Sequence, residues 1–179
     1  DFVMNFNSAF TWKRMTLALT MDWRKGGLVA DMTRTLWDEG GTSRDYDEPI
    51  TSKIFTKDWD LNAPATYTVN GHDYPYTAGS FRYDAWAGGS DVRAYLESGS
   101  YVRVRDLSVS WEAPQSVARA LRGRSLRVTA QARNPFMSTN YWSYDPEYNN
   151  FGATNQNRFI DLAPFPSARQ FFLSVDLGW

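Results

Sequence analysis

Two acidic residues on either side of a proline, Asp145 and Glu147, are the first candidates for catalytic chemistry in this sequence. A pair of carboxylic acids performs the acid and base steps of glycoside hydrolysis. Neighbouring acids separated by a proline are more typical of a turn, in which a carboxylate accepts hydrogen bonds from nearby backbone amides. We therefore expect a turn at Asp145-Pro146-Glu147, and we predict no catalytic residue and no enzymatic activity.

A second acidic cluster, Asp45-Tyr46-Asp47-Glu48, offers the hard oxygen ligands that Ca²⁺ prefers. It lacks the ligand spacing and the glycine of a dedicated calcium loop, so we expect a solvated acidic loop. The chain has no cysteine and one histidine, His72, which excludes thiol nucleophiles, disulfide bonds, cysteine-ligated zinc and most histidine-based triads. We predict no metal and no cofactor, and we interpret His72, beside Asn70-Gly71, as a turn residue.

Aromatic side chains are abundant in the polar parts of the chain, which contains 8 Trp, 10 Tyr and 11 Phe in all. These rings could stack on sugar rings or on peptide side chains, or they could pack loops against one another, and both options remain open. The candidates for ligand contact are Trp59, Trp86, Tyr141, Trp142, Tyr144 and Tyr148.

Four arginines fall within segments of alternating polarity: Arg103, Arg105, Arg127 and Arg133. They could line a wet lumen and bind anions. We favour the alternative that they pair with neighbouring acids such as Asp106 and Asp176.

The elements that must position these residues are mainly β-strands, because polar and apolar residues alternate with a period of two. The pattern predicts strands over 2–12 and 15–24 joined as a hairpin, over about 101–111, over 126–133 and over 168–179. The alternation changes phase near Asp106, which either a bulge or an exit from the apolar zone would explain. Short helices are expected over 28–38 and 116–121. The remaining segments, about 40–98 and 135–167, are polar and irregular.

Length and composition limit the class of protein further. The chain has 179 residues, a mass of 20.5 kDa and a formal net charge of −1, and nothing in this balance indicates binding to nucleic acid. The mean hydropathy is −0.52, and no apolar run approaches the roughly 20 residues that a spanning helix needs, which excludes a helical membrane protein. The first residues do not resemble a signal peptide, so we expect them to lie within a longer protein.

Alternation alone fits both a soluble β-sandwich and a transmembrane barrel. Three features favour the barrel. The predicted strands are about ten residues long, whereas globular strands are commonly about five or six. Short connections at 13–14 and 114–124 alternate with long ones at 26–98 and 135–167, as periplasmic turns and extracellular loops do. Trp12, Trp23, Trp111 and Trp179 lie at strand ends, where an interfacial aromatic girdle would place them.

If the strands cross a membrane, their apolar face contacts lipid and the opposite face lines the lumen. The predicted lipid-facing residues are Met15, Leu17, Leu19, Met21, Leu107, Val109, Leu126, Val128, Phe171, Leu173, Val175 and Leu177.

Several segments of the chain resemble motifs of one known protein family, and they occur in the same order as in that family. Phe6-Asn7-Ser8-Ala9-Phe10-Thr11-Trp12-Lys13 with Asp22-Trp23-Arg24-Lys25-Gly26-Gly27 resembles the late hairpin of SusC/RagA-type TonB-dependent transporters, and residues 96–111 resemble the family run "edGSyvRLrnvtLgY". Residues 132–136 are similar to its "GQNLf" strand end, residues 141–147 to its "YsGyDPE" loop, and residues 166–171 and 177–179 to its "yPrprtftlGl…F" ending. Ser143 and Trp179 depart from the family's glycine and terminal phenylalanine, and about 40–95 is unmatched.

The resemblance implies an all-β fold: the C-terminal strands of a large antiparallel transmembrane β-barrel with long extracellular loops. Residues 1–179 would be the C-terminal segment, without the plug and the N-terminal strands, of an outer-membrane importer of large nutrients (glycans or peptides). The implied partners are a SusD-like surface lipoprotein, the TonB complex through the missing plug and N-terminal segment, outer-membrane lipid and the barrel assembly machinery. The alternatives are a soluble β-rich carbohydrate-binding module and an outer-membrane scaffold that imports nothing.

The last predicted strand carries an apolar stripe that ends on an aromatic residue. In this type of family the assembly machinery recognises such a terminal strand, so the resemblance implies an assembly signal at Phe171, Leu173, Val175, Leu177 and Trp179. Trp179 would also anchor the strand at the periplasmic interface.

Overall fold

The alternating segments form five long strands in the computed structural model, which describes residues 1–47, 66–75, 77–89, 92–148 and 159–179. The chain divides into two units. The strand unit comprises residues 1–27, 99–140 and 166–179, and the loop unit comprises residues 28–98 and 141–165.

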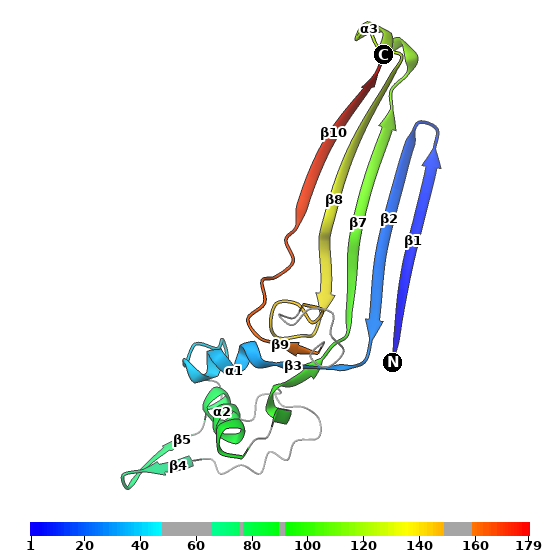
Figure 1. The fold of residues 1–179 in the computed structure, drawn as a ribbon. Coiled ribbons are helices and arrows are strands. Elements are labelled where there is room, and N and C mark those ends of the chain that lie inside the picture. The colour runs from blue at the N-terminus through cyan, green and yellow to red at the C-terminus, as the bar shows by residue number, and fades with distance from the viewer. Residues whose placement is uncertain (48–65, 76, 90–91, 149–158) are drawn as a thin grey trace. The chain divides into compact units, whose positions relative to one another are not determined.

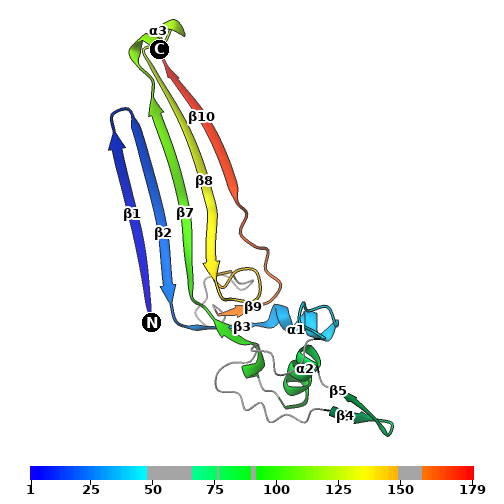
Figure 2. The ribbon, with the colours of Figure 1, turned by 180° about the vertical axis from the view of Figure 1, so that it is seen from behind.

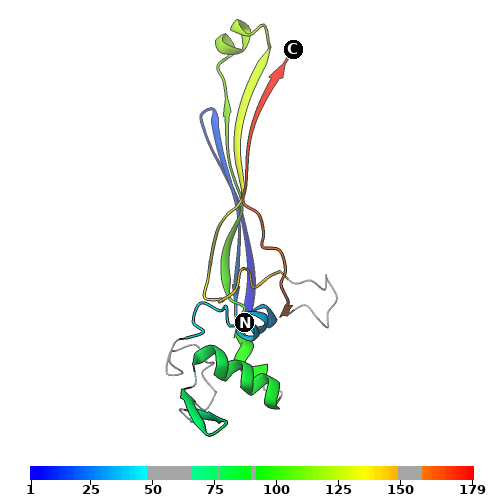
Figure 3. The same cartoon turned by 90° about the vertical axis from the view of Figure 1, so that its left-hand side faces the viewer.

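The strand unit is one antiparallel sheet with the order β1-β2-β7-β8-β10 (Figure 1). Its strands are β1 (Phe2–Trp12), β2 (Met15–Lys25), β7 (Tyr101–Glu112), β8 (Ser125–Thr139) and β10 (Gln170–Gly178). Figure 3 shows this sheet nearly edge-on as a single twisted layer. The predicted strands are confirmed, although β8 continues six residues further than expected, to Thr139 rather than to Arg133.

The register places the predicted apolar residues on one face, because directly opposed residues of neighbouring strands share a face. One row across the sheet is Trp12, Met15, Trp111, Val128 and Val175, and the next is Phe10, Leu17, Val109, Ala130 and Leu173. Within the described residues this face is largely uncovered: Leu173 is 74% exposed and Val175 is 61% exposed. The sequence-based assignment of residues to one common face is confirmed.

Leu126 is an exception to this exposed face. It is buried with Ala113 and Ala118, and Leu177 packs against the same cluster. Ala118 belongs to helix α3 (Gln115–Ala120), which lies in the connection between β7 and β8. The expectation that Leu126 faces lipid was therefore wrong, because α3 covers this end of the strand.

The opposite face of the sheet is polar and internally hydrogen-bonded. The Oγ atoms of Ser110 and Thr129 lie 3.0 Å apart, and Asn5 Nδ2 donates to Asp22 Oδ1 at 2.6 Å. The predicted pairing of arginines with acids is confirmed for three of them, with partly different partners: Arg105 with Asp22, Arg127 with Glu112 and Arg133 with Asp106.

A bulge interrupts the β7–β8 ladder where the alternation changes phase, which decides between the two explanations offered for that change. Val104 pairs with Phe136 and Asp106 pairs with Arg133, so Arg105 opposes both Asn134 and Pro135. The bulge reverses the alternation, and this puts Val104 on the same face as Leu107. A loop was predicted to begin at Asn134-Pro135, and this prediction was wrong because β8 continues through both residues. The bulge tolerates the missing N–H of proline and the positive φ of Asn134 (49°).

The turn at Lys13-Arg14 and the α3 connection lie at the same end of the sheet, which also holds the C-terminus (Figure 1 and, from behind, Figure 2). The predicted grouping of the two short connections is thereby confirmed.

The loop unit has more regular structure than predicted. It contains β3 (Leu28–Asp31), α1 (Met32–Glu39), β4 (Thr66–Val69), β5 (His72–Pro75), α2 (Ala78–Gly89), the 3₁₀ helix η1 (Val92–Tyr95), β6 (Leu96–Ser98) and β9 (Ile160–Asp161). Strands β6, β3 and β9 form a small sheet. The helix predicted to begin at 28 begins at Met32, because residues 28–31 are a strand. Asn70 and Gly71, with φ of 50° and 80°, close the β4–β5 hairpin, and His72 follows them as the first residue of β5. In the described part of the chain no helix is both long and apolar enough to cross a membrane.

Candidate functional site

Helix α1 begins at a buried aspartate. Asp31 ends β3, and its Oδ1 accepts a hydrogen bond of 3.0 Å from the backbone N–H of Arg34, which caps the helix. Residues three or four apart share a helix face. Arg34 and Asp38 therefore both point into the unit, where each side chain is buried.

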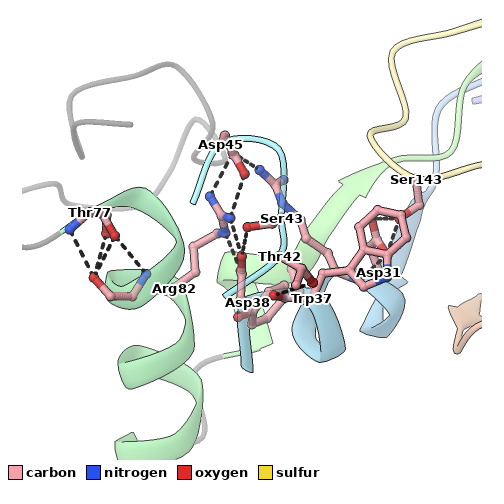
Figure 4. A network of polar contacts seen from close by, with 12 residues as sticks. Asp31, Trp37, Asp38, Thr42, Ser43, Asp45, Thr77, Arg82 and Ser143 are labelled. Atoms are coloured by element: carbon pink, nitrogen blue, oxygen red, sulfur yellow. Dashed lines mark hydrogen bonds and ion pairs between the residues drawn. The ribbon is translucent and has the colours of Figure 1, made fainter. Parts of the chain in front are cut away.

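A network of ion pairs forms the interior of the loop unit (Figure 4). Arg82 of α2 donates to both carboxylate oxygens of Asp38, at 2.8 and 2.7 Å, and to both of Asp45, at 3.1 and 3.0 Å. Arg34 pairs with Asp45 at 2.5 Å and with Glu97 at 2.6 Å. Tyr95 and Ser43 also donate hydrogen bonds to Asp38. The network thus joins α1, α2, the 43–45 turn and β6.

Asp45 corrects one expectation from the sequence. It is 6% exposed and paired with two arginines, so this part of the acidic cluster is neither a solvated loop nor a calcium ligand. Burial by itself would raise the pKa of Asp45, but Arg34 and Arg82 together hold that pKa below its ordinary value. Glu48 lies outside the described residues, and the described residues contain no group of three or more acidic or histidine side chains that could hold a metal ion.

Three consecutive residues bind to three carboxylates, of which those of Asp31 and Asp161 are buried and that of Glu97 is partly buried. Tyr141 Oη donates to Asp161 at 2.6 Å, the Trp142 backbone N–H donates to Glu97 at 2.7 Å, and Ser143 Oγ donates to Asp31 at 2.6 Å. Burial raises the pKa of Asp31 to about 7, and burial also raises the pKa of Glu97 and of Asp161 above their ordinary values. These contacts hold the 141–143 segment against the interior of the unit.

The outer side of this segment lines a hollow of about 640 Å³, whose other wall is the end of α1 and the following turn. The lining residues are Trp37, Thr42, Arg44, Trp142, Ser143 and Tyr144. The Trp37 ring meets Trp142 and Tyr144 edge-on, with centroid separations of 5.3 and 5.7 Å. The guanidinium groups of Arg34 and Arg44 lie 4.2 and 5.1 Å from the Trp142 ring centroid.

The predicted ligand-contact residues fall into four situations. Trp142 and Tyr144 line the hollow. Tyr141 is buried beside it and holds Asp161, so it supports the wall. Trp86 lies in α2 and packs near Tyr83. Tyr148 follows the 145–147 turn. Neither Trp86 nor Tyr148 lines the hollow. Trp59 lies outside the described residues.

Four lining residues were missed by the sequence reasoning: Trp37, Thr42, Arg44 and Ser143. Trp37 was assigned to a helix and not considered for binding. An aromatic residue in the last turn of a short helix pattern, followed by Gly-Gly and small hydroxyl residues, was the available signal. Asp145-Pro146-Glu147 is confirmed as a turn, since Asp145 Oδ1 accepts from the Glu147 N–H at 3.0 Å.

The terminal apolar stripe lies on β10, which pairs with β8. Trp179 follows the strand and is 76% exposed. The stripe is therefore present on one strand face, and its role in assembly stays a prediction.

The chain was compared with known proteins. No protein-family model matches it. It is 23% identical over 181 residues to the TonB-dependent receptor P3 of Formosa agariphila, covering 99% of this chain and 16% of the receptor. Among solved structures it is similar to the RagAB peptide transporter (TM-score 0.62, 20% identity, 97% of this chain and 16% of that chain). It is also similar to the RagAB peptide importer in the closed-closed state (TM-score 0.59, 18% identity, 98% of this chain and 17% of that chain).

The chain spans about one sixth of the length of these relatives, which are outer-membrane β-barrel proteins. The similarity extends over almost the whole chain and agrees with the motifs, which confirms the recognition made from the sequence. The chain has the fold of part of a TonB-dependent outer-membrane barrel and resembles transporters of the SusC/RagA type.

Proposed function

We propose that the chain is the C-terminal segment of a TonB-dependent outer-membrane importer of large nutrients, either glycans or peptides. The strand unit forms part of the barrel wall. The loop unit forms part of the extracellular vestibule, where nutrients are first bound. The chain itself performs no covalent chemistry.

The observation that carries this proposal is the apolar face of the five-stranded sheet, which the described residues leave largely uncovered. A soluble protein rarely exposes so continuous an apolar surface, whereas lipid covers it at no cost. The opposite face satisfies its polar groups with hydrogen bonds and ion pairs, as a wet lumen allows. A soluble carbohydrate-binding module would require a second layer over the apolar face.

The edges of the sheet support a larger barrel. Strands β1 and β10 are the outer strands of the described sheet. Lipid tolerates a sheet only when every backbone group is paired, and bacterial barrels contain at least about eight strands. The strands that close the barrel therefore come from the rest of the protein.

The proposed partners follow from the same relatives. RagAB pairs a barrel transporter with a surface lipoprotein, and we propose a lipoprotein of this SusD-like kind over the loop unit. The TonB complex would act through the plug and N-terminal segment. The barrel assembly machinery would insert the protein, and outer-membrane lipid would surround it.

Cysteine labelling of the full-length protein on whole cells tests the topology. The chain has no cysteine, so a cysteine can be placed at exposed Glu39 in the loop unit or at exposed Gln115 in α3, with any cysteine elsewhere replaced. An impermeant maleimide should label Glu39→Cys and should not label Gln115→Cys until the cells are lysed. The reverse pattern would contradict the proposed orientation.

Growth of a strain that lacks the full-length gene tests import. The deletion should abolish growth on at least one glycan or peptide of large size and leave growth on its monomers intact. Normal growth on every glycan and peptide, with the protein correctly placed in the outer membrane, would favour the scaffold alternative.

A further inference from the structure

Arg44 differs from the two arginines of the buried network. Arg34 and Arg82 are each paired with two carboxylates, whereas Arg44 is exposed and, among the described residues, is paired with none. One of its Nη2 hydrogens is donated to the Trp142 carbonyl at 3.2 Å, which holds the guanidinium beside the Trp142 ring. A guanidinium has five N–H donors, so most of them remain available to a ligand. Arg44 is the only charged residue among those described as lining the hollow.

The two hydroxyl residues of the hollow are oriented as acceptors. Thr42 Oγ1 donates its proton to the Trp37 carbonyl at 3.3 Å, and Ser143 Oγ donates to the carboxylate oxygens of Asp31 at 2.7 and 2.6 Å. Since a hydroxyl carries one proton, each oxygen then offers only lone pairs to a ligand. These oxygens suit a ligand that is rich in O–H donors.

The rings of the hollow are not equally available. The guanidinium groups of Arg34 and Arg44 lie over the Trp142 ring, so this ring already has partners within the chain. Tyr144 is 52% exposed and stands edge-on to Trp37 at 89°, which leaves ring surface open to the hollow. Such a surface packs against the C–H face of a sugar ring.

We propose that this hollow binds a sugar ring that carries a carboxylate, as a unit of an acidic oligosaccharide. The carboxylate pairs with Arg44, the ring packs on Tyr144, and the sugar hydroxyls donate to Thr42 and Ser143. The volume of about 640 Å³ accommodates a ligand of this size. A peptide fits less well, because its backbone offers one N–H per residue and no dense set of hydroxyl donors. The inference rests on the proposed function, since it names the substrate class of the same importer.

Binding is measured by titration calorimetry with the full-length protein in detergent. The probes are trisaccharides of galacturonic, glucuronic and mannuronic acid, each compared with its methyl ester, which keeps the rings and removes the charge. At least one acid should bind about tenfold more tightly than its ester, the loss expected when a charge-assisted hydrogen bond is removed. An acidic tripeptide, Glu-Tyr-Glu, serves as the competing class.

Four variants, two at Arg44 and two at Tyr144, assign the effect to the hollow. Arg44→Gln should abolish the preference for the acid over the ester, and Arg44→Lys should retain part of it. Tyr144→Ala should weaken the binding of both the acid and the ester, whereas Tyr144→Phe should bind both as tightly as the wild type does. Arg119→Gln, an exposed arginine on α3, is the matched control and should leave binding unchanged.

The outcomes separate the inference from the proposed function. Equal binding of acid and ester, no binding of any of the three acids, or tighter binding of the tripeptide would each overturn the carboxylated-sugar site. If the deletion strain still shows a growth defect on another nutrient, the importer proposal survives that result. The acid–ester comparison uses the wild-type protein, so misfolding of a variant cannot obscure it.

Discussion

Ser143 and Asp31 are 112 residues apart in the sequence, yet the Ser143 hydroxyl lies 2.7 and 2.6 Å from the two carboxylate oxygens of Asp31. Asp31 also caps α1. One carboxylate therefore joins the helix that carries Trp37 to the segment that carries Trp142 and Tyr144. Asp31 thus joins the two walls of the hollow, together with Glu97 and Asp161, which also bind the 141–143 segment.

The stability of the loop unit should fall as the pH rises through about 7. Burial raises the pKa of Asp31 to about 7, whereas an unfolded aspartate titrates near 3.9. Between these values the folded chain holds a proton that the unfolded chain has lost, so stability is highest at low pH and is lost as the pH rises. Thermal unfolding of the full-length protein at about pH 5 and about pH 8 should show this loss. Asp31→Asn should reduce the difference, and Asp47→Asn, at an exposed position, should not. Equal pH dependence in all three proteins would contradict this role of Asp31.

Removing Arg82 should strongly destabilise the loop unit. Arg82→Met leaves Asp38 buried without its bidentate partner, and breaking a buried ion pair costs about 3–5 kcal/mol. The double variant Arg82→Met with Asp38→Leu should be less destabilised, because it removes the unpaired charge as well. Arg119→Met on the surface is the control. Limited proteolysis and thermal unfolding measure the effect. A double variant that is less stable than Arg82→Met alone would argue against this account.

A methyl group at position 79 should disturb the contact between α2 and the 43–47 turn. A Cβ built on Gly79 would lie 2.3 Å from the Tyr46 ring and 3.0 Å from Tyr46 Cα, closer than real atoms approach. Overpacking of this kind costs about 1–3 kcal/mol. Gly40→Ala is the matched control, because its Cβ would be 3.4 Å from the Leu36 carbonyl and its φ is −81°. Thermal unfolding that ranks Gly40→Ala as the more damaging change would refute the packing argument.

Neighbouring residues on β8 should respond oppositely to charge. Val128 lies in the apolar row with Val175, and Thr129 lies on the polar face with Ser110 and Ser174. An arginine at mid-membrane on the lipid face costs about 2–4 kcal/mol, whereas the lumen face accepts it. Folding of the full-length protein into bilayers should therefore be impaired by Val128→Arg and not by Thr129→Arg. The opposite ranking would invert the assignment of the two faces.

Deletion of Trp179 should lower the amount of full-length protein in the outer membrane and leave aggregates in the periplasm. We propose that the β10 stripe, ending at exposed Trp179, forms part of the signal for barrel insertion. Trp179→Phe should be tolerated, since an aromatic ring remains at the interface. Cell fractionation measures the outcome, and unchanged surface levels in the deletion variant would count against this role.

The sequence by itself determined the strand unit. Period-two alternation identifies strands and their faces without reference to any partner, because a strand's side chains alternate by covalent geometry alone. The phase change near Asp106 marked the position of an irregularity for the same reason, and the strand register shows that it is a bulge. Two details of this unit were misjudged. The end of β8 was placed too early, since a proline normally stops a ladder and the opposing strand decides whether a bulge can absorb it. Leu126 was expected to face lipid, and its burial under α3 depends on a contact between elements.

Only the tertiary structure decided the loop unit and its hollow. Asp45 had the sequence context of a solvated acid, and its burial depends on Arg34 and Arg82, which are 11 and 37 residues away. Arg44 and Trp37 became candidates only when the 141–144 segment was placed beside them. Long-range ion pairs and hydrogen bonds select among loop conformations that local residue preferences leave nearly equal in energy. For this reason the residues that line the site could not be identified from their neighbours in the chain.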